Sequence, residues 1–186
     1  LIVINSMKVL SHLMMYKHLF NKKDTEEILT AFLFVFQKQH HIGKQCLQSL
    51  FLSMFEYPQG MIKVVPGTLL KISQTFNPSM AISSLEFLVS LGQRRELCVN
   101  FTDDDFKKVF MVAINYIQSP SSRLSQVSLS YVVHLAFEVL NTWFLRLKLH
   151  DRKSMMQFII QYLLKVSSSS NGGKLDENAE LVLDFL

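Results

Sequence analysis

Apolar residues recur along this chain at intervals of three and four positions, the pattern of α-helices with a buried face. The first run covers residues 2–20 and ends at the polar segment 21–24. Asp24 and Glu27 then have the spacing of a capping box, which predicts a second helix from about Thr25. Apolar residues cover more than half of the circumference of this second helix, so it should pack against neighbours on more than one side. They are Ile28, Leu29, Phe32, Leu33, Val35 and Phe36.

The same periodicity continues to the end of the chain, interrupted by prolines and polar clusters. Pro66-Gly67 falls inside the fourth predicted helix and should kink or split it, because proline removes a backbone donor and clashes with the preceding turn. Asn77 with Pro78 marks the start of the fifth helix, and Thr102 with Asp105 forms a further predicted capping box. The helices predicted after the second span residues 43–55, 59–75, 80–91, 94–99, 103–118, 124–147, 152–166 and 176 onward.

This pattern gives about ten helices and no pair of strands. Short connections favour antiparallel neighbours, and helix pairs recur about every 40 residues, as in two-helix repeats. The sequence therefore predicts an all-α fold, a HEAT/armadillo-like α-solenoid of about ten antiparallel helices, with a compact bundle as the alternative. Residues 1–186 form one such segment, and the serine- and glycine-rich residues 167–174 form a flexible loop within it. Both ends of the chain have the pattern of a helix interior, so we expect a segment truncated at both ends.

Composition points to contacts with other proteins rather than with nucleic acid. Hydrophobic residues make up 49% of the chain and charged residues 18%, against about 25% charged in an average domain. The surplus apolar surface must be buried on several sides of the helices or against a partner. The net charge is +4, but the basic residues are scattered, with their longest concentration at 146–153. A nucleic-acid-binding protein usually gathers them on one face, so no nucleic-acid partner is predicted.

The residues that could carry chemistry have simpler structural explanations. His40 and His41 are adjacent, so on a helix they point in different directions, and the sequence contains no HExxH, CxxC or Gly-rich phosphate motif. The triplet 103–105 of aspartates suits the first turn of a helix, where carboxylates complement the helix dipole. Cys46 and Cys98 lie among helical residues and should be buried, inert thiols. We therefore predict no catalytic, cofactor-binding or metal-binding residue, no cofactor and no small-molecule substrate.

Aromatic residues leave one choice open. The chain has 15 phenylalanines, which could line a lipid cavity but are more simply explained by packing between helices. Trp143 and Phe144, flanked by Arg146 and Lys148, could anchor a protein partner. Alternatively, the aromatic face packs inward while the basic side chains extend to solvent. No stretch approaches the roughly 20 apolar residues of a membrane span, and no signal peptide is apparent.

From about residue 46 to 165 the sequence resembles the central domain of the tuberin family. No single motif carries the resemblance, which depends on the order and spacing of many short matches. These are Met61–Lys63, Leu70–Ser73, Met80–Ile82, Leu85–Leu88 with Leu91, Asn100-Phe101, Val109-Phe110, Tyr116, Trp143–Arg146 with Leu149, Arg152-Lys153 and Phe158-Ile159, followed by Asp176–Glu180 at the start of the next helix.

The resemblance implies an α-solenoid from a protein whose separate GTPase-activating domain, with a hamartin-like subunit, regulates the Rheb-type small GTPase and target-of-rapamycin growth signalling. It implies a cytoplasmic protein that partners can hold on endomembranes. The family's activating domain uses a catalytic asparagine, and nothing in this chain matches that domain, so the resemblance implies a non-catalytic scaffold. Two alternatives stay open: a generic HEAT-like adaptor without any GTPase-activating domain, and a small helical enzyme or lipid carrier.

Overall fold

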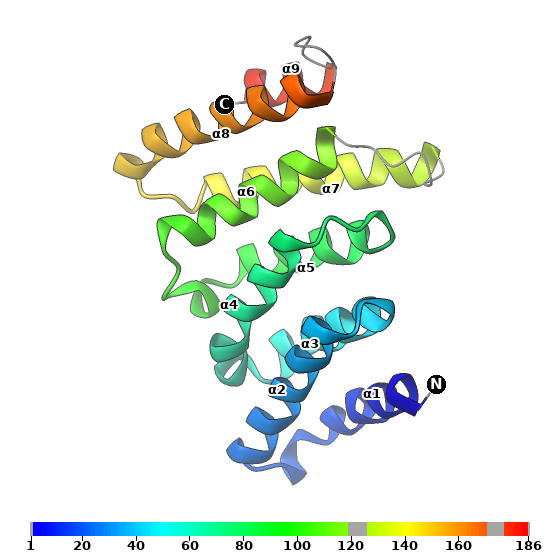
Figure 1. Ribbon diagram of the computed structural model, residues 1–186. Coiled ribbons are helices and arrows are strands. Elements are labelled where there is room, and N and C mark those ends of the chain that lie inside the picture. Colours follow the sequence, from blue (N-terminus) through cyan, green and yellow to red (C-terminus); the bar gives the residue numbers. More distant parts are fainter. Residues whose placement is uncertain (1, 119–125, 171–176, 186) are drawn as a thin grey trace. The chain divides into compact units, whose positions relative to one another are not determined.

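The computed structural model describes residues 2–118, 126–170 and 177–185, and within these ranges all regular structure is helical (Figure 1). No strand occurs in the described ranges, which confirms the predicted all-α class. None of the described helices is both long and apolar enough to cross a membrane. The chain divides into two compact units, the first comprising the described residues up to Gln74 together with Arg94–Asn100, the second comprising Thr75–Gln93 and the described residues from Phe101 on.

The described residues of unit 1 form four α-helices and three short 3-10 helices. Helix α2 contacts both α3 and α4, as the broad apolar surface of its sequence predicted, and α1 contacts α3. The side chains of Leu29, Phe32 and Phe36 on α2 are buried in this layer. The elements are α1 (Ile2–Leu13), η1 (Met14–Leu19), α2 (Lys22–Lys38), η2 (His40–Ile42), α3 (Gly43–Glu56), α4 (Pro58–Gln74) and η4 (Arg95–Cys98).

The first predicted helix, residues 2–20, is wrong beyond Leu13, where the chain changes to 3-10 geometry with a non-helical residue at Tyr16. Two side chains of the α3 and α4 region hold this turn at Met14. The Tyr57 hydroxyl donates to the Met14 carbonyl oxygen at 2.7 Å, and the Ser53 hydroxyl donates to the Met14 sulfur at 3.5 Å. Ser53 and Tyr57 lie 39 and 43 positions after Met14 in the chain. Their contacts therefore end α1 at a point where the local apolar pattern would continue the helix.

The second predicted helix begins earlier than expected, because the capping box is formed by Asn21 and Asp24 instead of Asp24 and Glu27. The Asp24 amide donates to the Asn21 side chain at 3.0 Å, and the Asn21 amide donates to the Asp24 carboxylate at 3.1 Å. Both pairs have the required spacing of three residues. The pair that forms includes asparagine, one of the strongest N-cap residues.

Helix α4 runs without interruption through Pro66, so the predicted split does not occur. A Cβ atom added at Gly67 would lie 2.8 Å from a methyl carbon of Leu33, and one added at Gly60 would lie 2.6 Å from a methyl carbon of Leu29. Both glycines therefore allow α4 to approach α2 closely.

In its described residues, unit 2 holds five α-helices and one 3-10 turn, and α6 lies beside both α7 and α8 (Figure 1). Helix α7 contacts both α5 and α6, and α6 also contacts α8 and α9. Asn77 caps the first turn of this unit as predicted, accepting a hydrogen bond from the Ser79 amide at 3.0 Å. The elements are η3 (Pro78–Met80), α5 (Ala81–Gln93), α6 (Asp103–Gln118), α7 (Gln126–Phe144), α8 (Leu149–Ser170) and α9 (Glu177–Phe185).

The predicted loop 167–174 is partly helical. Residues 167–170 form the last turn of α8, while 171–174, like residues 119–122 between two of the predicted helices, lie outside the described residues. Ser167 is buried, and its hydroxyl accepts a hydrogen bond from the Gln118 side-chain amide at 2.5 Å. The same amide also donates to the Leu163 carbonyl oxygen at 3.2 Å. These hydrogen bonds from Gln118 on α6 hold the last part of α8. The helix therefore continues beyond residue 166, where the serine-rich sequence predicted its end.

Candidate interaction surfaces

The aspartates at the start of α6 serve the helix itself. The Thr102 amide donates to the Asp105 carboxylate at 3.0 Å, and the Lys108 ammonium lies 2.7 Å from Asp104 and 3.1 Å from Asp105. Burial would raise the pKa of Asp105, but hydrogen bonds from Thr102 and Lys108 outweigh it and hold the pKa below its usual value. Carboxylates so engaged stabilise the helix start, as the sequence indicated.

The described residues contain no cluster of three or more His, Cys, Asp or Glu side chains that could hold a metal ion. Cys46 and Cys98 are both buried in unit 1. Burial raises the pKa of the Cys46 thiol to about 11, so at neutral pH the thiolate population is very small. A nucleophilic cysteine needs the opposite environment, one that favours the thiolate.

The sequence left open whether Trp143 anchors a protein partner or packs inward, and in the structure it packs inward. Its ring is completely buried, and the indole Nε1 donates to the Leu88 carbonyl oxygen of α5 at 2.9 Å. The Phe101 ring stacks on it with centroids 5.4 Å apart, and the Phe106 ring meets it edge-on at 5.7 Å. Trp143 is therefore the centre of the unit 2 core and is inaccessible to a partner.

Arg146 also supports this core. Its guanidinium donates to the Gly92 carbonyl oxygen at 2.8 Å and lies 5.6 Å from the Trp143 ring centre. Gly92 itself lies against α7, since a Cβ atom there would be 2.7 Å from Thr142 and 2.8 Å from the indole nitrogen of Trp143. The glycine, the tryptophan and the arginine together fix how α5 packs on α7.

An apolar groove of about 320 Å³ lies in unit 1 between α3 and the α1–η1 segment. Met15, Leu52 and Phe55 are exposed along it, and Met14 is buried beneath them. The polar lining comprises Ser53, Glu56 and the Ser11 and Ser49 hydroxyls, which lie 2.5 Å apart and share a hydrogen bond. A groove with exposed apolar side chains along its rim suits the apolar side chains of a protein partner.

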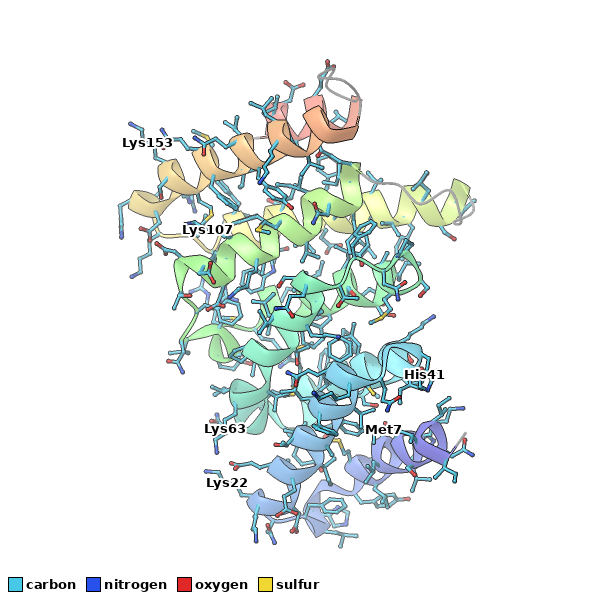
Figure 2. All side chains as sticks on the ribbon, in the orientation of Figure 1. Met7, Lys22, His41, Lys63, Lys107 and Lys153 are labelled. Carbon is cyan, nitrogen blue, oxygen red and sulfur yellow. The ribbon has the colours of Figure 1, made fainter. Side chains whose placement is uncertain are left out.

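Two further features extend this surface. The Arg94 guanidinium lies over the Phe55 ring, 4.1 Å from its centre, so it holds the ring at the rim while leaving it exposed. The opposite side of α1 from the buried Met7 (labelled in Figure 2) exposes Val9 and Leu13 beside a second hollow of about 300 Å³. Lys8 and His12 also line this hollow, so α1 exposes a mixed apolar and polar surface in addition to the residues that it packs against α3.

Sequence reasoning did not single out this groove. Along α3, the apolar stripe of Leu47, Leu50, Phe51 and Met54 lies largely in the core. Leu52 and Phe55 lie off that stripe but have the helical spacing of three residues. This second apolar pair, on a helix that already has one buried apolar face, is the sequence pattern that could have indicated the groove.

Comparison with known proteins identifies the family. The tuberin family model matches residues 2–150. The chain belongs to the tuberin family. It is also 31% identical over 187 residues to the tuberous sclerosis 2 protein homolog of Schizosaccharomyces pombe, and this match covers 94% of the chain. The same match covers 14% of that relative, so the chain spans about one seventh of its length.

The family match extends the resemblance seen in the sequence toward the N-terminus. Those short motifs began near residue 46, whereas the family model already matches from residue 2. At the other end it stops at residue 150, so the motif pairs Arg152-Lys153 and Phe158-Ile159 lie beyond it. All of unit 1, with its groove, therefore falls within the tuberin match.

Proposed function

We propose that this chain is a non-catalytic scaffold segment of a tuberin-like GTPase-activating protein. With a hamartin-like partner, the whole protein would regulate a Rheb-type small GTPase and target-of-rapamycin growth signalling in the cytoplasm. The membership in the tuberin family supports the assignment. The apolar groove of unit 1 is the observation that supports a protein-binding role for this part of the chain.

The scaffold is proposed to be a HEAT/armadillo-like α-solenoid. Within each unit, helices pack mainly on helices that are close to them in sequence, as α2 does on α3 and α4 and as α6 does on α7 and α8. Neighbour-only packing is the organising principle of repeat proteins. A compact 186-residue chain should have a radius of gyration of about 16 Å. A solenoid should exceed this value in small-angle X-ray scattering, and a value at or below it would favour the bundle instead.

The proposal assigns GTPase activation to the parent protein and not to these residues. The predicted absence of catalytic, cofactor-binding and metal-binding residues is part of the proposal. A direct check is to add the isolated chain to a Rheb-type GTPase loaded with GTP and to follow phosphate release. We expect the intrinsic rate, and an accelerated rate would overturn the non-catalytic assignment.

The groove is tested by measuring the affinity of the full-length tuberin-like protein for its hamartin-like partner. Leu52→Ser together with Phe55→Ser removes the exposed rim without touching the buried Met14. We expect about tenfold weaker binding, the loss typical of a removed apolar contact at an interface. The control is Leu181→Ser, which removes an exposed leucine from α9 in unit 2.

Equal affinities for all three proteins would show that the groove is not the partner site. The alternative function, a generic HEAT-like adaptor without any GTPase-activating domain, would be favoured if the full-length protein did not accelerate GTP hydrolysis at all. The two measurements are independent, so the scaffold role and the identity of its parent can fail separately.

A further inference from the structure

Two leucines are exposed where α7 ends and α8 begins, one just after α7 and the other as the first residue of α8. Leu145 is 62% exposed and Leu149 is 81% exposed, whereas Leu147 between them is buried. Single exposed leucines are common on protein surfaces and need no explanation. Here, however, two of them flank one buried anchor, so both project from the same short turn.

The turn that carries these leucines is well fixed. The Arg152 guanidinium donates to the Leu145 and Leu147 carbonyl oxygens, each at 3.2 Å. The Leu147 amide donates to Phe144, also at 3.2 Å, and the Asp151 amide donates to Lys148 at 3.0 Å. Most backbone polar groups of the turn are thus hydrogen-bonded within it. The two leucines therefore project from a turn with a fixed backbone.

Positive charge surrounds the two leucines. Residues 145–153 contain four basic side chains and one acidic side chain, a local charge of 4 − 1 = +3 with histidine neutral. The acidic residue, Asp151, lies 3.2 Å from the His150 ring nitrogen. Lys148 and Lys153 are exposed. Figure 2 shows Lys153 and Lys107, the latter from α6, at the same end of unit 2.

We propose that this turn, residues 145–153, is a docking site for an anionic lipid surface. Leu145 and Leu149 would enter the headgroup boundary while Lys148 and Lys153 contact lipid phosphates. Apolar insertion combined with electrostatic attraction is the general basis of reversible binding at a membrane interface. The site belongs to unit 2, whereas the groove residues belong to unit 1, and its proposal does not depend on the proposed scaffold function.

The exposure of the leucines favours a lipid surface over an acidic peptide. A side chain that is 81% exposed has little protein around it, so Leu149 projects from the surface. Peptides and small ligands are usually held in grooves and pockets. A bilayer needs no groove, because the projecting side chains enter the lipid themselves. The long lysine side chains can reach phosphates on either side of the leucines.

The test is sedimentation of the 186-residue chain with vesicles of phosphatidylcholine alone or of phosphatidylcholine mixed with phosphatidylserine. We expect binding to the mixed vesicles only, and a decrease with added salt, since surface attraction is screened. Leu145→Ser with Leu149→Ser, and separately Lys148→Glu with Lys153→Glu, should each lower the partition coefficient about tenfold. Matched controls are Leu181→Ser and Lys23→Glu, which change an exposed leucine and an exposed lysine elsewhere and should bind like the original chain.

Three results would overturn the proposal. The first is no binding to mixed vesicles, and the second is equal binding to neutral and mixed vesicles. The third is binding that the turn variants do not reduce more than the controls do. A fluorescent poly-glutamate peptide is tested alongside; if it binds and depends on the turn while vesicles do not bind, the turn is a protein site. Circular dichroism melting of each variant separates lost binding from lost folding.

Discussion

The indole nitrogen of Trp143 donates a hydrogen bond of 2.9 Å to the backbone carbonyl oxygen of Leu88. Leu88 lies on α5 and Trp143 lies on α7, 55 residues later in the chain. Both residues are buried, so this bond joins two helices inside the core of unit 2. A buried donor and acceptor must find partners, and here each provides the partner of the other.

Replacing Trp143 with phenylalanine should therefore destabilise the chain by more than its lost volume. The variant loses the hydrogen bond from the indole to the Leu88 carbonyl oxygen, and such a bond contributes about 0.5–1.5 kcal/mol. Urea unfolding followed by circular dichroism measures the loss. Leu145→Ala, an exposed position two residues later, should change stability by less than about 0.5 kcal/mol. Equal effects at the two positions would contradict the role of the hydrogen bond.

Gly92→Ala should be costly, although alanine is the better helix former. Its methyl group would lie 2.8 Å from the Trp143 nitrogen, and that ring is buried and hydrogen-bonded, so it cannot move aside. Overpacking of this kind costs about 1–3 kcal/mol. The matched variant is Gly60→Ala, whose methyl group would lie 2.6 Å from the end of the Leu29 side chain and in ordinary contact, at 3.8 Å, with Thr25. Thermal melting should rank Gly60→Ala as the more stable of the two, and the reverse order would show that α5 and α7 can separate slightly.

Asp105 should make stability depend on pH in the acidic range. Its pKa in the folded chain lies below the ordinary value of 3.8, so its contribution is present at neutral pH and is lost as pH falls through the folded pKa. Asp105→Asn should accordingly be less stable than the original chain at neutral pH, and the difference should shrink well below pH 3.8. Denaturant unfolding at a series of pH values measures it. A difference that stays constant would assign the effect to packing instead of charge.

Cys46 should react slowly with thiol reagents while the chain is folded. Raising its pKa from 9.0 to about 11 lowers the thiolate population at neutral pH about a hundredfold, and burial also blocks access. Mass spectrometry after timed treatment with an alkylating reagent, with Cys98→Ala to leave one thiol, follows the reaction. Unfolding in urea should raise the rate of Cys46 alkylation by at least the hundredfold difference in thiolate population. Fast modification of the folded chain would show that α3 opens readily.

The fold class could be predicted from the sequence because helical periodicity repeats over every described element. The sequence-based predictions were wrong where a contact with residues distant in the chain determines the local structure. Residues 14–19 have helical pattern, but Tyr57 and Ser53 hold Met14 in a different geometry. The serines after residue 166 have loop composition, yet Gln118 ties Ser167 to α6 and the helix continues.

The candidate surfaces were harder to predict for the same reason. The concentration of charge at 146–153 was visible in the sequence, but the pattern L-R-L-K-L does not reveal which leucine is buried. That depends on Arg152, which binds two carbonyl oxygens of the turn. Trp143 and Phe144 could equally have faced a partner, and only the position of the Leu88 carbonyl oxygen decides that Trp143 faces inward.

The division of the chain has a consequence for synthesis on the ribosome. Unit 1 includes Arg94–Asn100, and its short helix η4 packs on α4. Nascent chains emerge from the N-terminus, and their domains generally fold in that order. The segment Arg94–Asn100 follows α5 in the chain. Unit 1 is therefore incomplete until α5, which belongs to unit 2, has already emerged. For that interval the surface of α4 that receives η4 is uncovered, so unit 1 cannot complete its packing before the residues of α5 have been synthesised.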